Sequence, residues 1–221
     1  MTPEGKVSLL LKGLSINPMI ALIDYGMGNI HSVKKALETC SAKVLVTNNP
    51  KDILLSRKIV LPGVGAFDDA MGRLEEQGLV SVIKDGIKKK KPFLGICLGM
   101  QLLFEESEEA KKKKGLSILK GRVRKFPSGD FKVPHMGWNQ IKSCGRDRSI
   151  LLEGVAEGAD LYFCHSYYPQ PKDKAIIAAT TEYGLNFASF VQWENVFGVQ
   201  FHPEKSQETG LKIMGNFVRL C

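Results

Sequence analysis

The sequence predicts an α/β protein with a mixed, largely parallel central sheet flanked by helices and an antiparallel-rich second half. In the first half, short apolar runs alternate with segments of helical periodicity, which is typical of a parallel sheet. In the second half, short strand-like runs follow one another with turn residues between them. The 221 residues, 43% hydrophobic and 24% charged, suffice for one sizeable core. We expect residues 19–221 to form a single domain and residues 1–18 a mobile N-terminal extension.

The first half contains the predicted β–α alternation. Four apolar runs have the length and the β-branched content of buried strands: residues 19–24, 43–46, 58–61 and 93–96. Apolar residues at helical spacing predict helices between and after them: residues 30–39, about 69–85 and about 98–109. Asn29 and Asp68 stand where they could cap the first two helices.

The second half reads as short strands. They are predicted at residues 122–126, 139–142, 161–164, 176–180, 188–192 and 196–201. Turn residues separate them at 128–130 and 169–171, and Glu194-Asn195 is predicted to be a hairpin tip. Ser206 is expected to cap a last helix that ends near Leu220.

The formal charge of +8 is concentrated in two lysine runs, residues 88–91 and 111–114. Each follows a predicted helix, where cations suit the negative end of the helix dipole. A patch for nucleic acid or an acidic partner is the alternative. No aromatic-basic interleaving or zinc-finger spacing favours nucleic acid, so we expect none as a partner.

The five cysteines are widely spaced and form no CxxC pair, which indicates reduced thiols in a cytoplasmic protein. No apolar run approaches the roughly 20 residues of a membrane span, and the first residues lack the features of a signal peptide. We therefore expect a cytoplasmic protein without a membrane partner.

The segment GICLG at residues 95–99 has the pattern of a nucleophile elbow, placed where an apolar strand should turn into a helix. The two glycines allow a tight turn, and Cys97 would lie at a helix N-terminus, whose dipole favours a thiolate. The Leu98 N–H would face a developing oxyanion. Taken alone, the pattern fits a buried structural cysteine equally well. Cys164, inside an apolar strand, is expected to be a core residue.

His202 closes an apolar run and is followed by Pro203 and Glu204. The i, i+2 spacing in an extended chain places His202 and Glu204 on one side, so the carboxylate can hold one ring nitrogen while the other faces a thiol. Alone, this would more often be a surface turn, but an elbow cysteine favours a triad. No histidine has metal-ligand spacing with a carboxylate or thiolate, and we predict no metal and no cofactor.

The segment LPGVGAF at residues 61–67 follows a predicted strand and precedes a predicted helix. Its two glycines could let the backbone turn an N–H toward an oxyanion. An ordinary βα turn is equally compatible with this spacing. No Gly-Lys-Ser/Thr follows, which excludes a phosphate-binding loop.

Six motifs in chain order carry a resemblance to a known family: DYGMGN at 24–29, VLPGVGAF at 60–67, GICLGMQLL at 95–103, PHMGWN at 134–139, FCHSYY at 163–168 and GVQFHPEKS at 198–206. Together they resemble the class I, triad-type glutamine amidotransferases. Within that family they are most similar to glutaminases that serve imidazole glycerol phosphate synthesis in the histidine pathway. The resemblance covers about residues 19–221 and implies the flavodoxin-like fold of the family.

The resemblance also implies roles for individual residues. Cys97 would be the nucleophile, His202 the general base and then acid, and Glu204 its orienter. The oxyanion N–H groups would come from Leu98 and, after a loop flip, from Gly63 or Val64. The residues implied to contact glutamine are Gly65, Gln101, Glu109, His165, Ser166 and Tyr167. The residues implied at a docking face or ammonia exit are Asn29, Trp138, Tyr162 and Lys205.

The implied activity is hydrolysis of L-glutamine, with delivery of the ammonia to a (βα)8-barrel cyclase subunit in a heterodimer. That cyclase would form imidazole glycerol phosphate and aminoimidazole carboxamide ribotide. Alternatives are a glutaminase for another acceptor synthase, such as one of pyridoxal phosphate or anthranilate synthesis, a binding module with an inactive site, and a cysteine hydrolase acting alone. The motifs at 24–29 and 134–139 favour the histidine pathway, and the intact triad residues argue against an inactive site.

Overall fold

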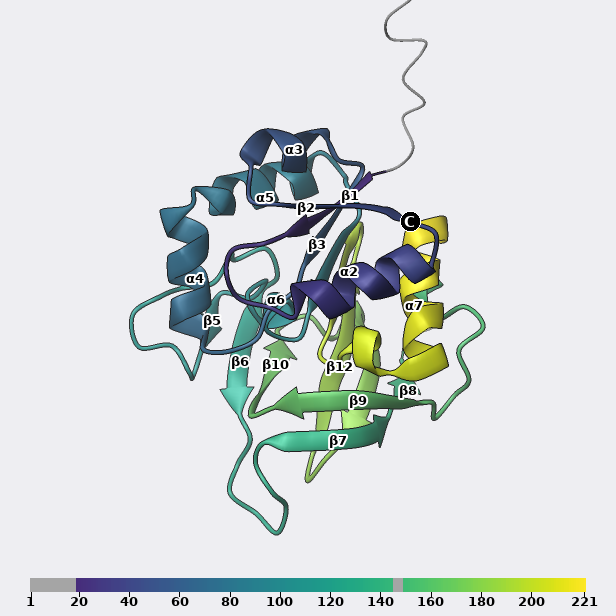
Figure 1. Ribbon diagram of the computed structural model, residues 1–221. Coiled ribbons are helices and arrows are strands. Elements are labelled where there is room, and N and C mark those ends of the chain that lie inside the picture. The colour runs from purple at the N-terminus through teal and green to yellow at the C-terminus, as the bar shows by residue number, and fades with distance from the viewer. Residues whose placement is uncertain (1–18, 145–148) are drawn as a thin grey trace, which may run out of the picture.

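A mixed eight-stranded sheet forms the centre of the molecule in the computed structural model, which describes residues 19–144 and 149–221 (Figure 1). Its strand order is β2-β1-β3-β4-β13-β12-β11-β8. Neighbours from β2 to β13 pair in parallel, and those from β13 to β8 pair antiparallel. The strands are β1 (Met19–Ile23), β2 (Lys43–Thr47), β3 (Lys58–Leu61), β4 (Phe93–Ile96), β8 (Lys142–Ser143), β11 (Ile177–Glu182), β12 (Asn186–Trp193) and β13 (Val196–Val199). The predicted mixed, largely parallel sheet is confirmed, whereas the extension predicted at residues 1–18 lies outside the described residues.

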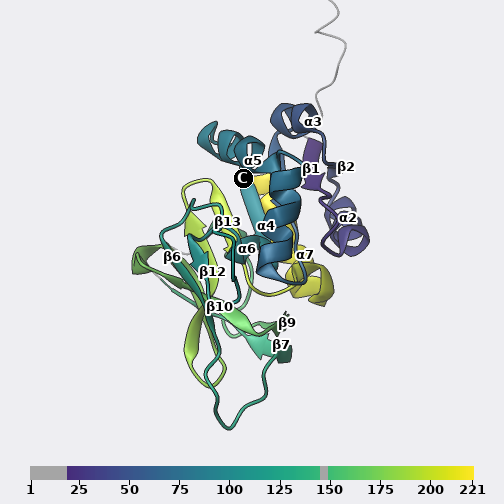
Figure 2. The same cartoon turned by 90° about the vertical axis from the view of Figure 1, so that its left-hand side faces the viewer.

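Helices cover both faces of the parallel half of this sheet (Figure 2). Successive side chains of a strand point to opposite faces, and β1 shows the consequence. Ile20 and Leu22 pack in one core cluster with residues of α2 and α7, while Ala21 and Ile23 pack in another with residues of α4 and α5. The α-helices are α2 (Ile30–Thr39), α3 (Pro50–Leu55), α4 (Phe67–Glu76), α5 (Leu79–Lys88), α6 (Leu98–Gln101) and α7 (Gln207–Leu220).

The second half adds two small sheets beside the antiparallel edge (Figure 1). One contains β5 (Glu106–Ser107), β6 (Gly121–Lys125) and β10 (Tyr167–Pro171). The other is an antiparallel pair of β7 (His135–Gln140) and β9 (Asp160–His165), here called the β7–β9 ribbon. The predicted hairpin at Glu194-Asn195 is confirmed, because Trp193 pairs with Val196. Short 3₁₀ helices are η1 (Ile150–Leu152), η2 (Lys174–Ile176) and η3 (Pro203–Lys205).

The helix predicted at 69–85 is two helices. Gly78 adopts the left-handed conformation with φ 67° and separates α4 from α5. Asp68 does not cap the first of them. Its carboxylate instead accepts hydrogen bonds from the backbone N–H groups of Lys111, Lys112 and Lys113 at 2.9, 3.1 and 3.0 Å. The second lysine run therefore lies in a loop held by Asp68, and the expectation that it follows a helix is wrong.

The helix predicted at 98–109 is wrong for most of its length. It is the single turn α6, because the backbone carbonyls beyond it bind another segment: Leu102 O accepts from Leu116 N, and Leu103 O from Ile118 N and Leu119 N. Helix α3 was not predicted. Residues 169–171, predicted as a turn, belong to β10, and Ser206 precedes α7 without a side-chain capping bond.

Within residues 19–144 and 149–221, every helix is too short or too polar to cross a lipid bilayer.

Candidate active site

Cys97 occupies the sharp turn between β4 and α6, with φ 54° and ψ −109°. Positive φ is costly for a residue with a Cβ atom and persists only where the surroundings enforce it. Here the Cys97 N–H donates to Val199 O of β13 at 2.8 Å. A Cβ on Gly99 would lie 2.0 Å from Leu61 O, and one on Gly95 would lie 2.6 Å from Gly99 O. The predicted sharp turn from strand to helix is confirmed. Gly95 and Gly99 are both needed, because neighbouring backbone atoms occupy the space that a Cβ atom would fill.

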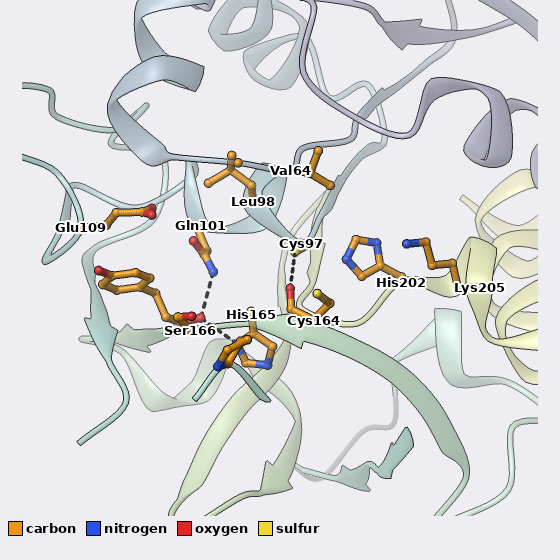
Figure 3. A pocket seen from close by; sticks show the side chains of 13 residues that line it. Val64, Cys97, Leu98, Gln101, Glu109, Cys164, His165, Ser166, His202 and Lys205 are labelled. Carbon is orange, nitrogen blue, oxygen red and sulfur yellow. Dashed lines mark hydrogen bonds between the residues drawn. The ribbon is translucent and has the colours of Figure 1, made fainter. Parts of the chain in front are cut away.

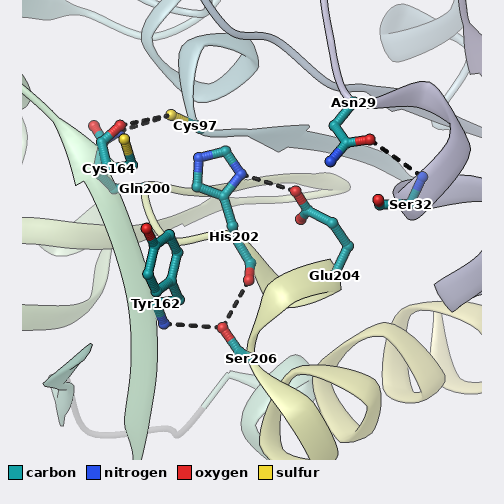
Figure 4. Close-up of polar contacts among 9 residues, drawn as sticks. All are labelled: Asn29, Ser32, Cys97, Tyr162, Cys164, Gln200, His202, Glu204 and Ser206. Carbon is teal, nitrogen blue, oxygen red and sulfur yellow. Dashed lines mark hydrogen bonds and ion pairs between the residues drawn. The ribbon is translucent and has the colours of Figure 1, made fainter. Parts of the chain in front are cut away.

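His202 lies between Cys97 and Glu204 (Figure 4). Its Nδ1 is 2.8 Å from Glu204 Oε1, and both side chains are almost fully buried. Burial by itself lowers the pKa of His202, but contact with the Cys97 thiolate and with the Glu204 carboxylate outweighs it and raises the pKa to about 10. The arrangement favours a charged imidazolium between the sulfur and the carboxylate.

Ser206 and β9 hold the backbone of His202. The Ser206 hydroxyl donates to His202 O at 2.6 Å and accepts from Tyr162 N at 2.9 Å (Figure 4). The His202 N–H donates to Tyr162 O at 2.8 Å. This use of the Ser206 hydroxyl explains why it does not cap α7.

A cavity of about 300 Å³ opens at Cys97 (Figure 3). Its size suits a small ligand rather than a macromolecule. Most of the predicted site residues line it, and the lining residues are Val64, Gly65, Cys97, Leu98, Gln101, Glu109, Pro134, Cys164, His165, Ser166, Tyr167, His202 and Lys205. Glu204 lies behind His202, and Gly63, Asn29, Trp138 and Tyr162 are outside this lining.

The end of the cavity away from Cys97 is polar (Figure 3). Gln101 Nε2 donates to Tyr167 O at 2.9 Å. Glu109 Oε2 accepts from the Phe67 N–H at 3.0 Å, and burial raises the pKa of this carboxyl. The Glu109 carboxylate at this end can accept hydrogen bonds from an ammonium group.

The loop between β3 and α4 packs directly against the elbow. A Cβ on Gly63 would lie 2.9 Å from both Gly99 N and Leu98 Cβ, so only glycine fits there. The buried Tyr25 hydroxyl donates to Pro62 O at 3.0 Å, which fixes the orientation of the Pro62–Gly63 peptide. Burial, and secondarily the charge on Cys97, hold the pKa of Tyr25 well above its usual value, so the phenol keeps its proton.

Three of the four residues predicted at a docking face or exit form a chain of contacts that begins at Lys205 in the cavity lining. Lys205 Nζ lies 5.7 Å from the centroid of the Tyr162 ring, and the Tyr162 and Trp138 rings are 6.0 Å apart edge to face. Trp138 is 49% exposed. Asn29 caps α2 by accepting from Ser32 N at 3.4 Å, as predicted, and lies beyond Glu204 when seen from Cys97 (Figure 4).

Sequence reasoning missed two residues that touch the Cys97 sulfur. Cys164, predicted as core, lines the cavity, and its carbonyl oxygen lies 3.9 Å from Cys97 Sγ. The alternation along β9 leaves Cys164 and Tyr162 half-buried, whereas Phe163 between them packs in the core. Gln200 Nε2 lies 3.6 Å from Cys97 Sγ. Its position two residues before His202 is the only signal that could have found it.

No cluster of three or more potential metal ligands of the His, Cys, Asp and Glu types occurs in the described ranges.

The chain is similar to known proteins along nearly its whole length. The family model for glutamine amidotransferase class-I matches residues 21–220. The imidazole glycerol phosphate synthase subunit HisH of Moorella thermoacetica is 50% identical over 201 residues, which cover 91% of this chain and 94% of the relative. HisH of Aquifex aeolicus is 52% identical over 199 residues, covering 90% and 95%.

Solved structures show the same fold at low sequence identity. PurLQS from Thermotoga maritima superposes with a TM-score of 0.72 at 18% identity, covering 93% of this chain and 99% of that one. A glutamine amidotransferase from Thermotoga maritima superposes with a TM-score of 0.60 at 17% identity, covering 85% and 76%.

Proposed function

Because the chain belongs to the class-I glutamine amidotransferases, among the HisH subunits of imidazole glycerol phosphate synthase, we propose that it hydrolyses L-glutamine with Cys97, His202 and Glu204. The observation that carries the proposal is the strained elbow cysteine in a small cavity, in contact with a buried histidine that is itself bonded to a buried carboxylate.

The reaction begins with the ion pair of Cys97 and His202. The thiolate attacks the amide carbon of glutamine, and the carbonyl oxygen becomes an oxyanion that the Leu98 N–H and an N–H of Gly63 or Val64 stabilise. His202 gives its proton to the leaving nitrogen, and the C–N bond breaks to release ammonia. Water, deprotonated by His202, then attacks the thioester carbon and expels the sulfur, which leaves glutamate and the free enzyme. Glu204 keeps the ring of His202 oriented throughout.

The polar end of the cavity binds the backbone end of glutamine. The Glu109 carboxylate accepts from its α-ammonium group, and Gly65, Gln101 and the segment from His165 to Tyr167 surround the rest. The distance between this end and Cys97 then sets the length of the substrate side chain whose amide can be cleaved.

The released ammonia passes directly to a (βα)8-barrel cyclase subunit, bound as a heterodimer, which forms imidazole glycerol phosphate and aminoimidazole carboxamide ribotide. Direct transfer matters because ammonia in water near neutral pH is largely protonated and no longer a nucleophile. Exposed apolar side chains support this docking face. Met136 and Trp138 lie two residues apart on β7, and Val64 lines the cavity; all three are more than a third exposed.

The proposal is tested by measuring glutamate release with and without a (βα)8-barrel cyclase and its nucleotide ligand. We expect low turnover alone and a stimulation of at least roughly tenfold in the complex, the size of a typical coupling between sites. High turnover that does not depend on the partner would sink the coupled-subunit proposal.

The nucleophile is tested by Cys97→Ala in the complex. Glutamate release should fall by at least about a thousandfold, while activity with added ammonium salts persists because the cyclase receives ammonia from solution. Cys164→Ala is the matched control, since it removes the neighbouring thiol and should leave most glutaminase activity. Near-normal glutamate release by Cys97→Ala would show that the nucleophile is another residue.

We also propose that residues 19–221 form one amidotransferase domain, in line with the family match over residues 21–220. The five unpaired cysteines favour a cytoplasmic location.

A further inference from the structure

Helix α6 is too short to stabilise a thiolate by its dipole. It has four residues, whereas the dipole of a helix grows from many aligned peptide units. A charged sulfur on Cys97 therefore needs other partners. His202 provides one. The Cys164 carbonyl oxygen, 3.9 Å from the sulfur, can only accept a hydrogen bond from a thiol, so the side-chain amide of Gln200 is the other donor within reach of the sulfur.

Gln200 is buried beside the central sheet, and both its backbone and its side chain have hydrogen-bond partners. It is fully buried, and its backbone N–H donates to Ser189 O of β12 at 2.9 Å. Its side-chain Nε2 lies 3.6 Å from Cys97 Sγ, and its Oε1 accepts from Gln101 Nε2 at 3.0 Å. Both ends of the amide thus have a partner.

The hydrogen-bond chain fixes which end of the Gln200 amide faces the sulfur. The Tyr167 carbonyl can only accept, so the Gln101 atom 2.9 Å from it must be the nitrogen. The second hydrogen of that nitrogen points to Gln200, which must present its oxygen. The Gln200 nitrogen consequently faces Cys97. A flipped amide would set two N–H groups against each other and an oxygen lone pair against the thiolate.

A buried histidine, His165, holds the Tyr167 carbonyl from the other side, and a second, His135, holds His165. His165 Nδ1 donates to it at 2.7 Å, so His165 Nε2 accepts from His135 Nδ1 at 3.0 Å. Burial lowers the pKa of His135 to about 4 and that of His165 to about 3, so both rings are neutral and each has one donor and one acceptor. The chain continues to Asn139, whose Nδ2 lies 3.2 Å from His135 Nε2 and also donates to Glu182 O at 2.9 Å.

We propose that Gln200 is a further catalytic residue, which donates a hydrogen bond from Nε2 to the Cys97 sulfur and stabilises it as a thiolate. This inference rests on the proposed role of Cys97 as nucleophile. The same N–H acts twice in a turnover. It holds the thiolate before attack, and it stabilises the sulfur again when thioester hydrolysis breaks the C–S bond and the electron pair returns to sulfur. Hydrogen bonds to a charged acceptor are the strong ones.

The test measures how fast iodoacetamide, a neutral reagent, alkylates Cys97 across a range of pH. Each cysteine is read separately by peptide mass spectrometry. Gln200→Met keeps the length and volume of the side chain and removes the donor. The midpoint of the Cys97 profile should move upward by about one pH unit, with about tenfold slower alkylation at pH 7. The profile of Cys164 in the same samples should not move.

A second variant and a control distinguish the loss of the Gln200 hydrogen bond from a change in side-chain packing. Gln200→Glu keeps an oxygen for Gln101 and sets a carboxyl oxygen against the sulfur, so it should slow alkylation at pH 7 at least as much as Gln200→Met. Ser189→Ala removes a buried hydroxyl on the neighbouring strand and should leave the profile of Cys97 unchanged. An unmoved Cys97 profile in either folded Gln200 variant overturns the proposal.

Glutaminase kinetics of the complex distinguish this inference from the function itself. Gln200→Met should lower kcat/KM about tenfold near pH 7, and the deficit should shrink as pH rises and the thiolate forms without help. If the wild-type complex released no glutamate, the proposed function would fail, while the alkylation profile would still decide the role of Gln200. A deficit that is equal at all pH values would indicate a packing defect and count against the hydrogen bond.

Discussion

At the scale of single residues, Gly99 can only be glycine because backbone atoms of strand β3 lie against it. Its Cα faces Leu61 O of β3, and an added methyl group would overlap that oxygen. Gly99→Ala should therefore destabilise the protein by about 2–3 kcal/mol or more and abolish glutaminase activity, because Cys97 directly precedes α6 and would be displaced with it. Chemical denaturation and glutamate release measure the two effects.

Gly72 in α4 is the matched control for that substitution. A Cβ there meets nothing within 4 Å, so Gly72→Ala should stabilise the protein by up to about 1 kcal/mol through helix propensity. If Gly99→Ala were as stable and active as the wild type, the close contact of α6 and β3 would not govern the elbow.

The Tyr25 hydroxyl is a second residue-scale control point, because it holds Pro62 O in the loop proposed to supply an oxyanion N–H. Tyr25→Phe removes this bond and should ease the proposed loop flip. We expect partner-independent glutamate release to rise roughly fivefold, the worth of a typical hydrogen bond, with a smaller change in the complex. Tyr183→Phe, which loses a remote bond to Lys132 O, should change neither rate. An unaltered basal rate in Tyr25→Phe would show that this bond does not restrain the loop.

At the scale of elements, local patterns predicted the parallel strands well and the helix boundaries poorly. Strands β1, β3 and β4 are short apolar runs, which is typical of strands in a parallel sheet that is covered on both faces. The turn at Gly78 is invisible to apolar periodicity, because residues on both sides of it continue an amphipathic pattern. The end of α6 depends on carbonyl partners about 15 residues away in sequence, which no local pattern reveals.

In the candidate site, too, local sequence patterns predicted some residues and not others. His202 and Glu204 are two residues apart, so their contact follows from strand geometry, and the elbow glycines mark Cys97. Gln200 and Cys164 reach the sulfur only because β13 and β9 converge on it. Their roles depend on tertiary packing. The sequence marks Gln200 only by its position two residues before His202, and it gives no reason to select Cys164.

Lys58 links strand β3 to helix α7 through hydrogen bonds, and a substitution can test this link. It lies on β3, is buried, and its Nζ donates to Phe217 O at 2.8 Å and to Val218 O at 2.7 Å near the C-terminus of α7. Lys58→Met should cost about 1–3 kcal/mol of unfolding free energy, since helix-end carbonyls lose a charged donor. Lys43→Met on the exposed start of β2 is the control and should stay within about 0.5 kcal/mol. Equal stability of the two variants in urea would contradict a role for Lys58 in fixing α7.

At the scale of the whole molecule, the site lies at one edge of the sheet. The ends of three neighbouring strands, β3, β4 and β13, lead into the loop at Gly63, into Cys97 and into His202 respectively. Carboxyl ends of parallel strands meet at one edge, so this convergence follows from the fold class. The β7–β9 ribbon closes the site from the other side and contributes the buried histidines.

Those histidines make the stability of the whole fold depend on pH. The pKa of His135 is about 4 and that of His165 about 3 in the folded protein, against about 6.5 in an unfolded chain. Between these values the unfolded state binds more protons, so the free energy of unfolding falls as pH drops below 6.5. Each group contributes a slope of at most about 1.4 kcal/mol per pH unit.

Urea unfolding at intervals from pH 7 to pH 4 measures this slope. His135→Asn places an amide N–H where the Nδ1–H of His135 donates to His165, and it removes one titrating ring. The variant loses packing and is less stable at pH 7, but its stability should fall less steeply with acid than that of the wild type. His31→Asn, on the exposed side of α2, should keep the wild-type slope. If His135→Asn kept it as well, the acid sensitivity would arise elsewhere, and His135 would not be held as a neutral ring by its burial in the β7–β9 ribbon.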